Sequence, residues 1–207
     1  VKIQIDDQIL FKNFNLEAHS GEKVVIFGKS GLGKTTLFRA ILGFLTPKKG
    51  YIKVDGLVVN EENNTQIRDK IAYVPQNTNL GKENVQTFID LIFGFKANQH
   101  LRPSRVHLEE RLHEFQLEKD ILSKSMQDLS GGEKQRIFLI ICCLLDRSII
   151  LLDEPTASLD QDLKDLVSEK ILDLKSKTIL IISHDNIWKK IPDVKIIPLS
   201  EKLQGDN

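Results

Sequence analysis

Short runs of apolar, often β-branched residues recur along the chain, separated by polar segments rich in glycine, asparagine, aspartate and lysine. Such runs are typical of β-strands, and those without polar interruption are typical of strands buried on both faces of a sheet. The pattern predicts strands over residues 2–5, 14–18, 23–27, 51–54, 71–74, 149–152, 178–182 and 194–197.

Between these runs, apolar residues return at the spacing of one helix face. The spacing predicts helices over 35–42, from after Gly132 to about 145, and over 161–175, the first of them closed by Gly43. From about 84 to 115 the pattern is helical throughout, which indicates a helical lobe inserted into the sheet-forming part. Strands that alternate with helices indicate a mostly parallel sheet covered on both faces. The polar segment 60–66 is expected to be a surface loop.

Composition narrows the class of protein. The chain has 207 residues, 41% of them hydrophobic, which suits one globular domain. Lysine plus arginine and aspartate plus glutamate both number 29, so no broad basic surface for nucleic acid is expected. The longest apolar run, Ile137 to Leu145, is far short of the roughly 20 residues that cross a bilayer. Cys142 and Cys143 lack the spacing of a metal or redox site, so we expect core residues in a reducing compartment.

The first residue carries a separate expectation. The chain opens with Val1 and without a signal-peptide pattern, so we expect the numbering to begin inside the protein or after trimming.

A glycine-rich segment joins the strand expected at 23–27 to the following helix. It matches G-x-x-x-x-G-K-[ST] through Gly28, Lys29, Ser30, Gly31, Leu32, Gly33, Lys34 and Thr35, with Thr36 next. Glycines let the backbone wrap around phosphate oxygens, whose charge is met by N–H groups and the helix N-terminus. We expect Lys34 to contact the β- and γ-phosphates and Thr35 to ligate Mg²⁺. Alone, the loop predicts an ATPase, a GTPase or a kinase; the alternative is an ordinary glycine-rich turn.

Two carboxylates end the apolar strand at 149–152. In parallel α/β sheets ligands bind at the carboxyl ends of the strands, which is where Asp153 and Glu154 are expected. Asp153 fits the role of holding Mg²⁺, and Glu154 fits that of the general base that polarises the attacking water. The alternative is a solvated strand end.

The segment Leu129-Ser-Gly-Gly-Glu-Lys-Gln-Arg136 is the most specific motif in the chain. Ser130, Gly131 and Gly132 are expected at a helix N-terminus, where a hydroxyl, exposed amides and the helix dipole favour an anion. The segment resembles the signature motif of ABC ATPases. The resemblance implies that it binds the γ-phosphate of a nucleotide held by the opposite subunit. A capping box between Ser130 and Glu133 is compatible with this role.

Further segments resemble elements of the same family in the same order, so that the resemblance covers nearly the whole chain. Gln76, in Val-Pro-Gln, resembles the Q-loop glutamine, which contacts Mg²⁺ or water; the alternative is a turn glutamine. Residues 155–160 resemble the D-loop, with Asp160 meeting the other subunit. His184 resembles the switch histidine that touches the γ-phosphate; a lone histidine at a strand end is more often structural.

The resemblance implies an α/β fold of the P-loop NTPase type. It has a mostly parallel sheet core, an N-terminal antiparallel β subdomain and an inserted α-helical lobe. We expect a single domain over 1–207, with the core at 1–76 and 146–207 and the lobe at about 77–145. Unlike the family, the segment around Gln4, Ile5 and Asp6 has no aromatic residue to stack on adenine. Ile5 could pack on the base instead, or an aromatic could come from elsewhere.

The resemblance also implies cofactors and partners. The cofactors are ATP and Mg²⁺, and Glu154, His184, Gln76 and Lys34 take part in hydrolysis. A second nucleotide-binding domain, in a homodimer or heterodimer, completes the site, and a transmembrane permease uses the movement. The chain would then lie in the cytoplasm, on the inner face of the membrane. Two alternatives remain: a soluble ABC ATPase of the iron-sulfur assembly type, and a non-enzymatic, ATP-gated interaction module.

Several residues outside the motifs have plainer expectations. The apolar group Phe88, Ile92, Phe93 and Phe95 lies where permeases dock in the family, although we expect most of it to form the core of the lobe. The remaining histidines, His19, His100, His107 and His113, have no ligand spacing and are expected in solvent. Ile187 and Trp188 are expected to be packing residues.

Overall fold

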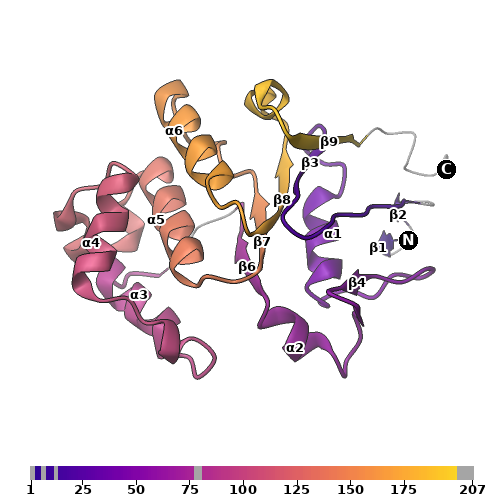
Figure 1. Ribbon diagram of the computed structural model, residues 1–207, viewed down its shortest axis with the longest axis horizontal. Coiled ribbons are helices and arrows are strands. Elements are labelled where there is room, and N and C mark those ends of the chain that lie inside the picture. The colour runs from indigo at the N-terminus through magenta and orange to yellow at the C-terminus, as the bar shows by residue number, and fades with distance from the viewer. Residues whose placement is uncertain (1–2, 6–7, 12–13, 77–80, 200–207) are drawn as a thin grey trace.

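A five-stranded parallel sheet forms the centre of the molecule (Figure 1). The computed structural model describes residues 3–5, 8–11, 14–76 and 81–199. In order across the sheet, the strands are β6 (Ile71–Val74), β7 (Ile149–Asp153), β8 (Thr178–Ser183), β3 (Lys23–Phe27) and β9 (Val194–Pro198). All four neighbouring pairs are parallel. The predicted parallel sheet is confirmed, and each strand differs from its predicted bounds by at most one residue.

Helices cover both faces of the sheet, which explains why its strands are apolar without interruption. On one face Ile26 and Leu151 pack with helix α1 (Lys34–Ile41). On the other face their neighbours Val25 and Ile150 join the cluster of α5 (Gly131–Leu144) and α6 (Gln161–Leu172). Figure 1 shows α1 on one side of the sheet and α5 and α6 on the other. Each fully buried aliphatic side chain contributes about 1.5–3 kcal/mol.

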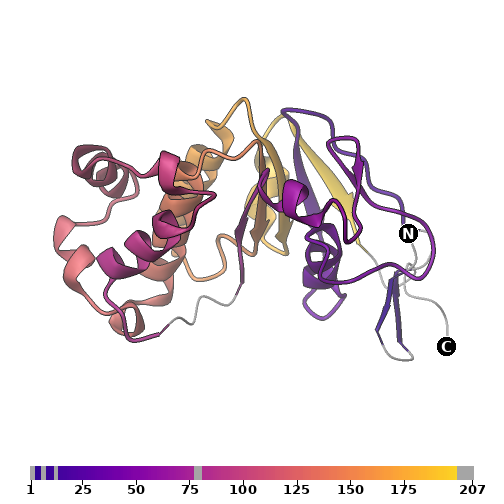
Figure 2. The same cartoon turned by 90° about the horizontal axis from the view of Figure 1, so that it is seen from below.

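Beyond α5, further helices form a group at one end of the molecule (Figures 1 and 2). These are α3 (Val85–Gly94) and α4 (Arg105–Glu114), with 3-10 turns η1 (Gln99–Leu101), η2 (Lys119–Ser123) and η3 (Met126–Asp128). Asn84 and Ser104 cap α3 and α4 through their side chains. Phe93 is buried, whereas Phe95 is 54% exposed. The domain boundaries at residues 77 and 145 stay a prediction.

The N-terminal region departs from two sequence predictions. Residues 14–18 form no strand; the antiparallel pairs are β1 (Ile3–Ile5) with β2 (Gln8–Phe11), and β4 (Lys53–Val54) with β5 (Leu57–Val58). The predicted loop at 60–66 contains the start of a short helix, α2 (Asn64–Arg68), because Ile67 is apolar and fully buried. The question of what stacks on adenine concerns Asp6 and the side chains of Gln4 and Ile5, which lie outside the described part of the chain.

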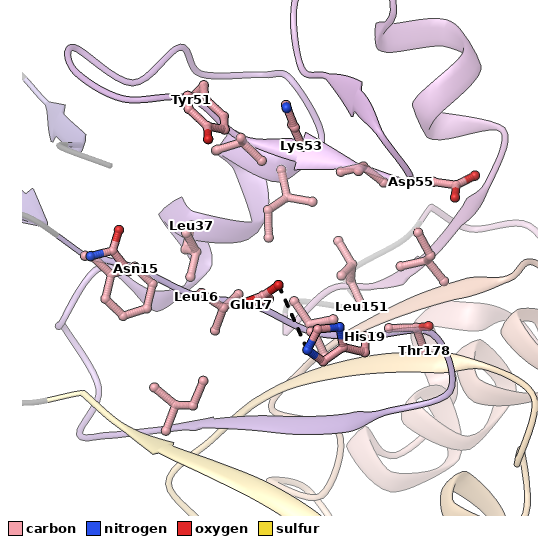
Figure 3. A pocket seen from close by; sticks show the side chains of 18 of the residues that line it. Asn15, Leu16, Glu17, His19, Leu37, Tyr51, Lys53, Asp55, Leu151 and Thr178 are labelled. Atoms are coloured by element: carbon pink, nitrogen blue, oxygen red, sulfur yellow. Dashed lines mark ion pairs between the residues drawn. The ribbon is translucent and has the colours of Figure 1, made fainter.

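A cavity of about 1040 Å³ explains the missing strand. It lies between residues 14–20, α1, residues 50–56 and the sheet, and Figure 3 shows Leu37 and Leu151 among its lining side chains, with Tyr51 and Lys53 on the segment across from them. Phe14 is buried and Asn15 exposed, as the alternation predicts. A strand also needs a neighbour at hydrogen-bonding distance, and the cavity separates residues 14–18 from β4.

Several smaller expectations are confirmed. Cys142 is buried, Cys143 is half-buried, and both are free thiols. Trp188 and Ile187, in the 3-10 turn η4 (Asn186–Lys190), belong to the core. The predicted solvent-facing histidines are exposed: His19, His100, His107 and His113. Over the described residues, every helix is too short or too polar to span a bilayer.

Candidate functional site

The glycine-rich loop lies between the end of β3 and the start of α1. Gly33 is the N-cap of α1 and has a φ of 75°, a left-handed conformation that favours glycine. At Gly28, an added Cβ would lie 2.9 Å from the carbonyl oxygen of Leu199, so the loop has no room for a side chain there. The Leu32 side chain is buried in the core, so only the backbone of Leu32 is available on the inner side of the loop. The loop is therefore anchored at both ends.

Lys34 is the buried cation of this loop. Its Nζ donates hydrogen bonds to the carbonyl oxygens of Gly28 at 2.6 Å and Lys29 at 2.8 Å. The same Nζ lies 3.6 Å from Oε1 of Glu154, and both side chains are at most 5% exposed. A positive charge is thus held at the centre of the loop, beside the acidic end of β7.

Thr35 and Asp153 meet at the first turn of α1. The Thr35 hydroxyl donates to Oδ2 of Asp153 at 2.6 Å. Oδ1 of Asp153 is buried and has no hydrogen-bond partner among the described residues. Burial raises the pKa of Asp153, while the hydrogen bond from Thr35 lowers it and the nearby Glu154 raises it further. A buried carboxylate oxygen without a partner beside a hydroxyl is a suitable site for a hard cation.

Glu154 is held in an unusual conformation next to His184. Its φ is 52°, uncommon for a residue with a side chain, and its N–H donates to the Ile182 carbonyl at 2.8 Å. Oε2 of Glu154 lies 2.9 Å from Nδ1 of His184 and accepts a longer bond, 3.4 Å, from the His184 backbone N–H. The carboxylate is buried, whereas the imidazole is 53% exposed. The histidine therefore lies between a buried carboxylate and solvent.

One pocket of about 310 Å³ brings most of the predicted residues together. Its lining residues are Ser30, Gly31, Gly33, Lys34, Thr35, Thr36, Gln76, Asp153, Glu154 and Ile182. Gln76 is exposed and ends the described stretch that follows β6. The larger cavity of Figure 3 has none of these residues in its lining. The smaller pocket is therefore the candidate site, because the predicted cation, hydroxyl and carboxylates converge there.

Ser130, Gly131 and Gly132 lie elsewhere, at the N-terminus of α5, and do not line this pocket. A capping box is present: the Ser130 N–H donates to Glu133 at 2.8 Å, and the Glu133 N–H donates to the Ser130 hydroxyl at 3.2 Å. Ser130 is nevertheless exposed. An added Cβ on Gly132 would lie 3.1 Å from the Ser158 carbonyl oxygen, so this glycine lets the helix tip sit against the loop after β7.

Sequence reasoning missed a polar cluster behind the site. Thr156 is fully buried, and its hydroxyl donates to Oδ2 of Asp185 at 3.3 Å. Nζ of Lys164, on α6, lies 2.6 Å from the same oxygen. Asp160, predicted to meet another subunit, is the N-cap of α6 and accepts from Leu163 N–H at 3.0 Å. The one available signal was the position of Asp185 directly after His184.

Comparison with known proteins is informative at this point. A model of the ABC transporter family matches residues 11–157. The energy-coupling factor transporter ATP-binding protein EcfA1 of Mycoplasma pneumoniae is 30% identical over 178 residues, which is 85% of this chain and 65% of that protein. Its counterpart in Mycoplasmopsis pulmonis is 33% identical over 172 residues, which is 80% of this chain and 63% of that protein. The chain thus spans slightly less than two thirds of the length of these relatives.

A solved structure shares the fold over almost the whole chain. It is described as the dimer of the ATP-binding cassette MJ0796 in a post-hydrolysis state, bound to ADP and Pi. The identity is 27% and the TM-score 0.78, and the match covers 97% of this chain and 91% of that one.

Proposed function

Because the chain belongs to the ABC transporter family, we propose that it binds Mg-ATP between two like domains and hydrolyses it to drive movement in a membrane partner. One observation carries this proposal. Lys34, the Thr35–Asp153 pair and Glu154, whose carboxylate is contacted by His184 from outside the lining, converge on a single pocket. They supply a cation that binds phosphate, a metal site and a general base, which phosphoryl transfer to water requires together.

Phosphate binding begins with the loop after β3. Lys34 exchanges its bonds to the loop carbonyls for the β- and γ-phosphate oxygens, which are stronger, charged acceptors. The exposed amides at the start of α1 add the positive end of the helix dipole. Ser30, Gly31 and Thr36, which line the same pocket, lie along the phosphate chain. The described residues support the binding of the phosphates more than the binding of adenine.

The residues at the strand end fit a magnesium ion. Thr35 and Asp153 supply two adjacent oxygens, one of which is buried without a partner among the described residues, and Gln76 lies at the mouth. When bound, Mg²⁺ supplies positive charge that offsets the charge developing on the phosphates. A bound cation would offset the cost that burial places on the ionised form of Asp153.

Glu154 and His184 act on the attacking water. The Glu154 carboxylate leaves Lys34 when the phosphates take that cation, and its freed oxygen accepts a proton from the water. His184 holds the other oxygen, and so restrains the rotation of the carboxylate. The exposed edge of its ring is the side available to contact the γ-phosphate.

A second domain supplies the remaining anion-binding group. Ser130 lies at an exposed helix tip outside the pocket, so it reaches a phosphate only in a neighbouring domain. In a head-to-tail pair of two copies, the N-terminus of α5 in each copy faces the phosphate pocket of the other copy. This pairing gives two equivalent sites. The solved relative described as a dimer with ADP and Pi supports this pairing. Loss of the γ-phosphate removes the anion shared by Lys34 and Ser130, and the pair opens.

The partner that uses this movement is a transmembrane permease. The support is that the curated relatives are named as ATP-binding proteins of energy-coupling factor transporters, which favours transport over iron-sulfur assembly. The chain then lies at the cytoplasmic face of the membrane, held there by the permease. The exposed side chains of Leu91 and Phe95, in and directly after α3, provide apolar area for this contact.

Two measurements test the proposal. Purified protein with Mg-ATP is expected to release phosphate, and the rate is expected to fall to background when EDTA removes the metal. Affinity purification from detergent-solubilised membranes is expected to recover a multi-span protein in a fixed ratio to the chain. Absence of phosphate release in both the isolated chain and the recovered complex contradicts ATPase function, and recovery of soluble partners alone contradicts the membrane role.

A further inference from the structure

The cluster behind the site joins three segments that are distant in the sequence. Thr156 follows Glu154 by two residues, and Asp185 follows His184 by one. The Thr156 hydroxyl donates to Oδ2 of Asp185 at 3.3 Å, and Nζ of Lys164 lies 2.6 Å from the same oxygen. The Asp185 carboxylate thus links the loop after β7, the turn after β8 and helix α6.

Asp185 is also fixed from its own side. Its Oδ1 accepts from the Ile187 N–H at 3.2 Å, and its backbone N–H donates to the Ser183 hydroxyl at 3.0 Å. Although burial raises the pKa of Asp185, hydrogen bonds from Lys164, Ile187 and Thr156 lower it, and the net shift is downward. The carboxylate is therefore ionised at neutral pH, with both oxygens engaged.

These contacts of Asp185 lie close to Glu154, the residue of the site that has an unusual backbone conformation. Glu154 has a φ of 52°, and such conformations persist only where the surrounding structure enforces them. The hydrogen bonds that enforce it run between the same two segments: Glu154 to the Ile182 carbonyl and to His184 on one side, Thr156 to Asp185 on the other. Without the second, the loop after Glu154 loses its side-chain hydrogen bond to the turn after β8.

We propose that Asp185 is a positioning residue for ATP hydrolysis, which holds Thr156 and thereby keeps the Glu154 carboxylate against His184. The inference rests on the proposed function, because it assigns Asp185 to the reaction at that site. Lys164 supports the role by balancing the Asp185 charge from α6. Neither Asp185 nor Thr156 lines the phosphate pocket, so both act through Glu154.

The expected signature is a change in turnover without a change in nucleotide binding. A shift of about 1 Å in a catalytic group is enough to lower the rate about a hundredfold. The groups expected to bind the phosphates and the metal, Lys34, Thr35 and Asp153, are held by other contacts and stay in place. We therefore expect kcat to fall while KM for ATP stays within about twofold.

The decisive comparison is Thr156→Val against Thr156→Ser. Valine matches threonine in shape but has no hydroxyl, whereas serine keeps the donor. Phosphate release under saturating Mg-ATP is expected to show kcat lowered about tenfold or more in Thr156→Val and restored to within about threefold of wild type in Thr156→Ser. Thermal unfolding of each variant separates this loss from a failure to fold.

A second pair of variants addresses the charge. Lys164→Met removes one partner of Asp185, and Lys170→Met is the matched control on the same helix, since Lys170 forms no ion pair among the described residues. We expect kcat to fall in Lys164→Met and to be unchanged in Lys170→Met.

Distinct results overturn the inference and the proposed function. Folded Thr156→Val and Lys164→Met proteins that turn over ATP at the wild-type rate show that Asp185 has no positioning role. A parallel rise in KM with an unchanged kcat has the same consequence, because it assigns the cluster to binding. If the wild-type protein itself releases no phosphate in its complex, the proposed function fails, and the inference falls with it.

Discussion

Replacement of Glu154 by glutamine tests the assignment of the general base. Glutamine has the same shape and can still accept a hydrogen bond from His184, so the change removes the negative charge and the proton-accepting ability alone. A general base typically contributes about 10²–10⁴-fold to a rate, which is about 2.7–5.4 kcal/mol at about 1.36 kcal/mol per tenfold. The structure favours the upper half of that range, because the carboxylate is 4% exposed and bulk water cannot replace it.

Folding is expected to survive this change. Lys34 keeps its hydrogen bonds to the Gly28 and Lys29 carbonyls, at 2.6 and 2.8 Å, so no buried cation is left without a partner. The free energy of unfolding should therefore change by less than about 2 kcal/mol.

The assay has three readouts. Phosphate release under saturating Mg-ATP gives kcat, titration with a fluorescent ATP analogue gives affinity, and size exclusion with light scattering gives mass. We expect kcat to fall about 10³-fold or more, affinity to be retained, and an ATP-bound dimer of twice 23.6 kDa to accumulate. Glu169→Gln, an exposed position on α6, is the control. A Glu154→Gln protein with kcat within about threefold of wild type would refute the assignment.

Three further predictions concern the tip of α5. Ser130→Arg is expected to abolish the ATP-dependent dimer in light scattering while a fluorescent nucleotide still binds the monomer; loss of nucleotide affinity would contradict an action across the interface. Gly132→Ala places a Cβ 3.1 Å from the Ser158 carbonyl oxygen, so urea unfolding should show no gain in stability, although alanine favours a helix over glycine by about 1 kcal/mol; a gain of that size would contradict the close contact. The hydrogen bond from the Ser130 N–H lowers the pKa of Glu133 below its usual 4.5, so its stabilisation is present above pH 4.5 and is lost as the pH falls through the lowered value. Glu133→Gln should therefore be about 0.3–1 kcal/mol less stable than wild type at pH 7 and equal to it in acid; a difference that persists in acid would contradict the electrostatic origin.

The sequence was most informative for segments whose side chains are buried on both faces. The strand predicted at 71–74 is β6, with the same bounds, and the helix predicted to run from after Gly132 to about 145 is α5, which begins at Gly131 and ends at Leu144. Both segments are packed in the main core, so their apolar spacing records the fold directly. The family and the parallel sheet could be predicted for the same reason: most of the motif residues lie at the ends of such strands, and the most specific motif lies at the start of α5, in chain order.

Contacts between distant segments could not be predicted. Residues 14–18 have the alternation of a strand, yet pairing depends on the position of β4, which local sequence does not encode. The short helix α2 depends on the burial of Ile67. Likewise, the hydrogen bond between Thr156 and Asp185 joins residues 29 positions apart, and a threonine in a loop gives no signal of its partner. The roles of the individual site residues stay predictions.

A mixing experiment tests the central claim, that the helix tip of one copy completes the phosphate site of another. Lys34→Ala lacks the cation that binds phosphate, and Ser130→Ala lacks the hydroxyl at the helix tip without adding the bulk that blocks pairing, so each variant alone is expected to have background ATPase activity. In an equimolar mixture, random pairing places one intact site in half of the dimers, and about a quarter of the wild-type activity should return. A mixture no more active than the two variants measured separately would contradict the claim.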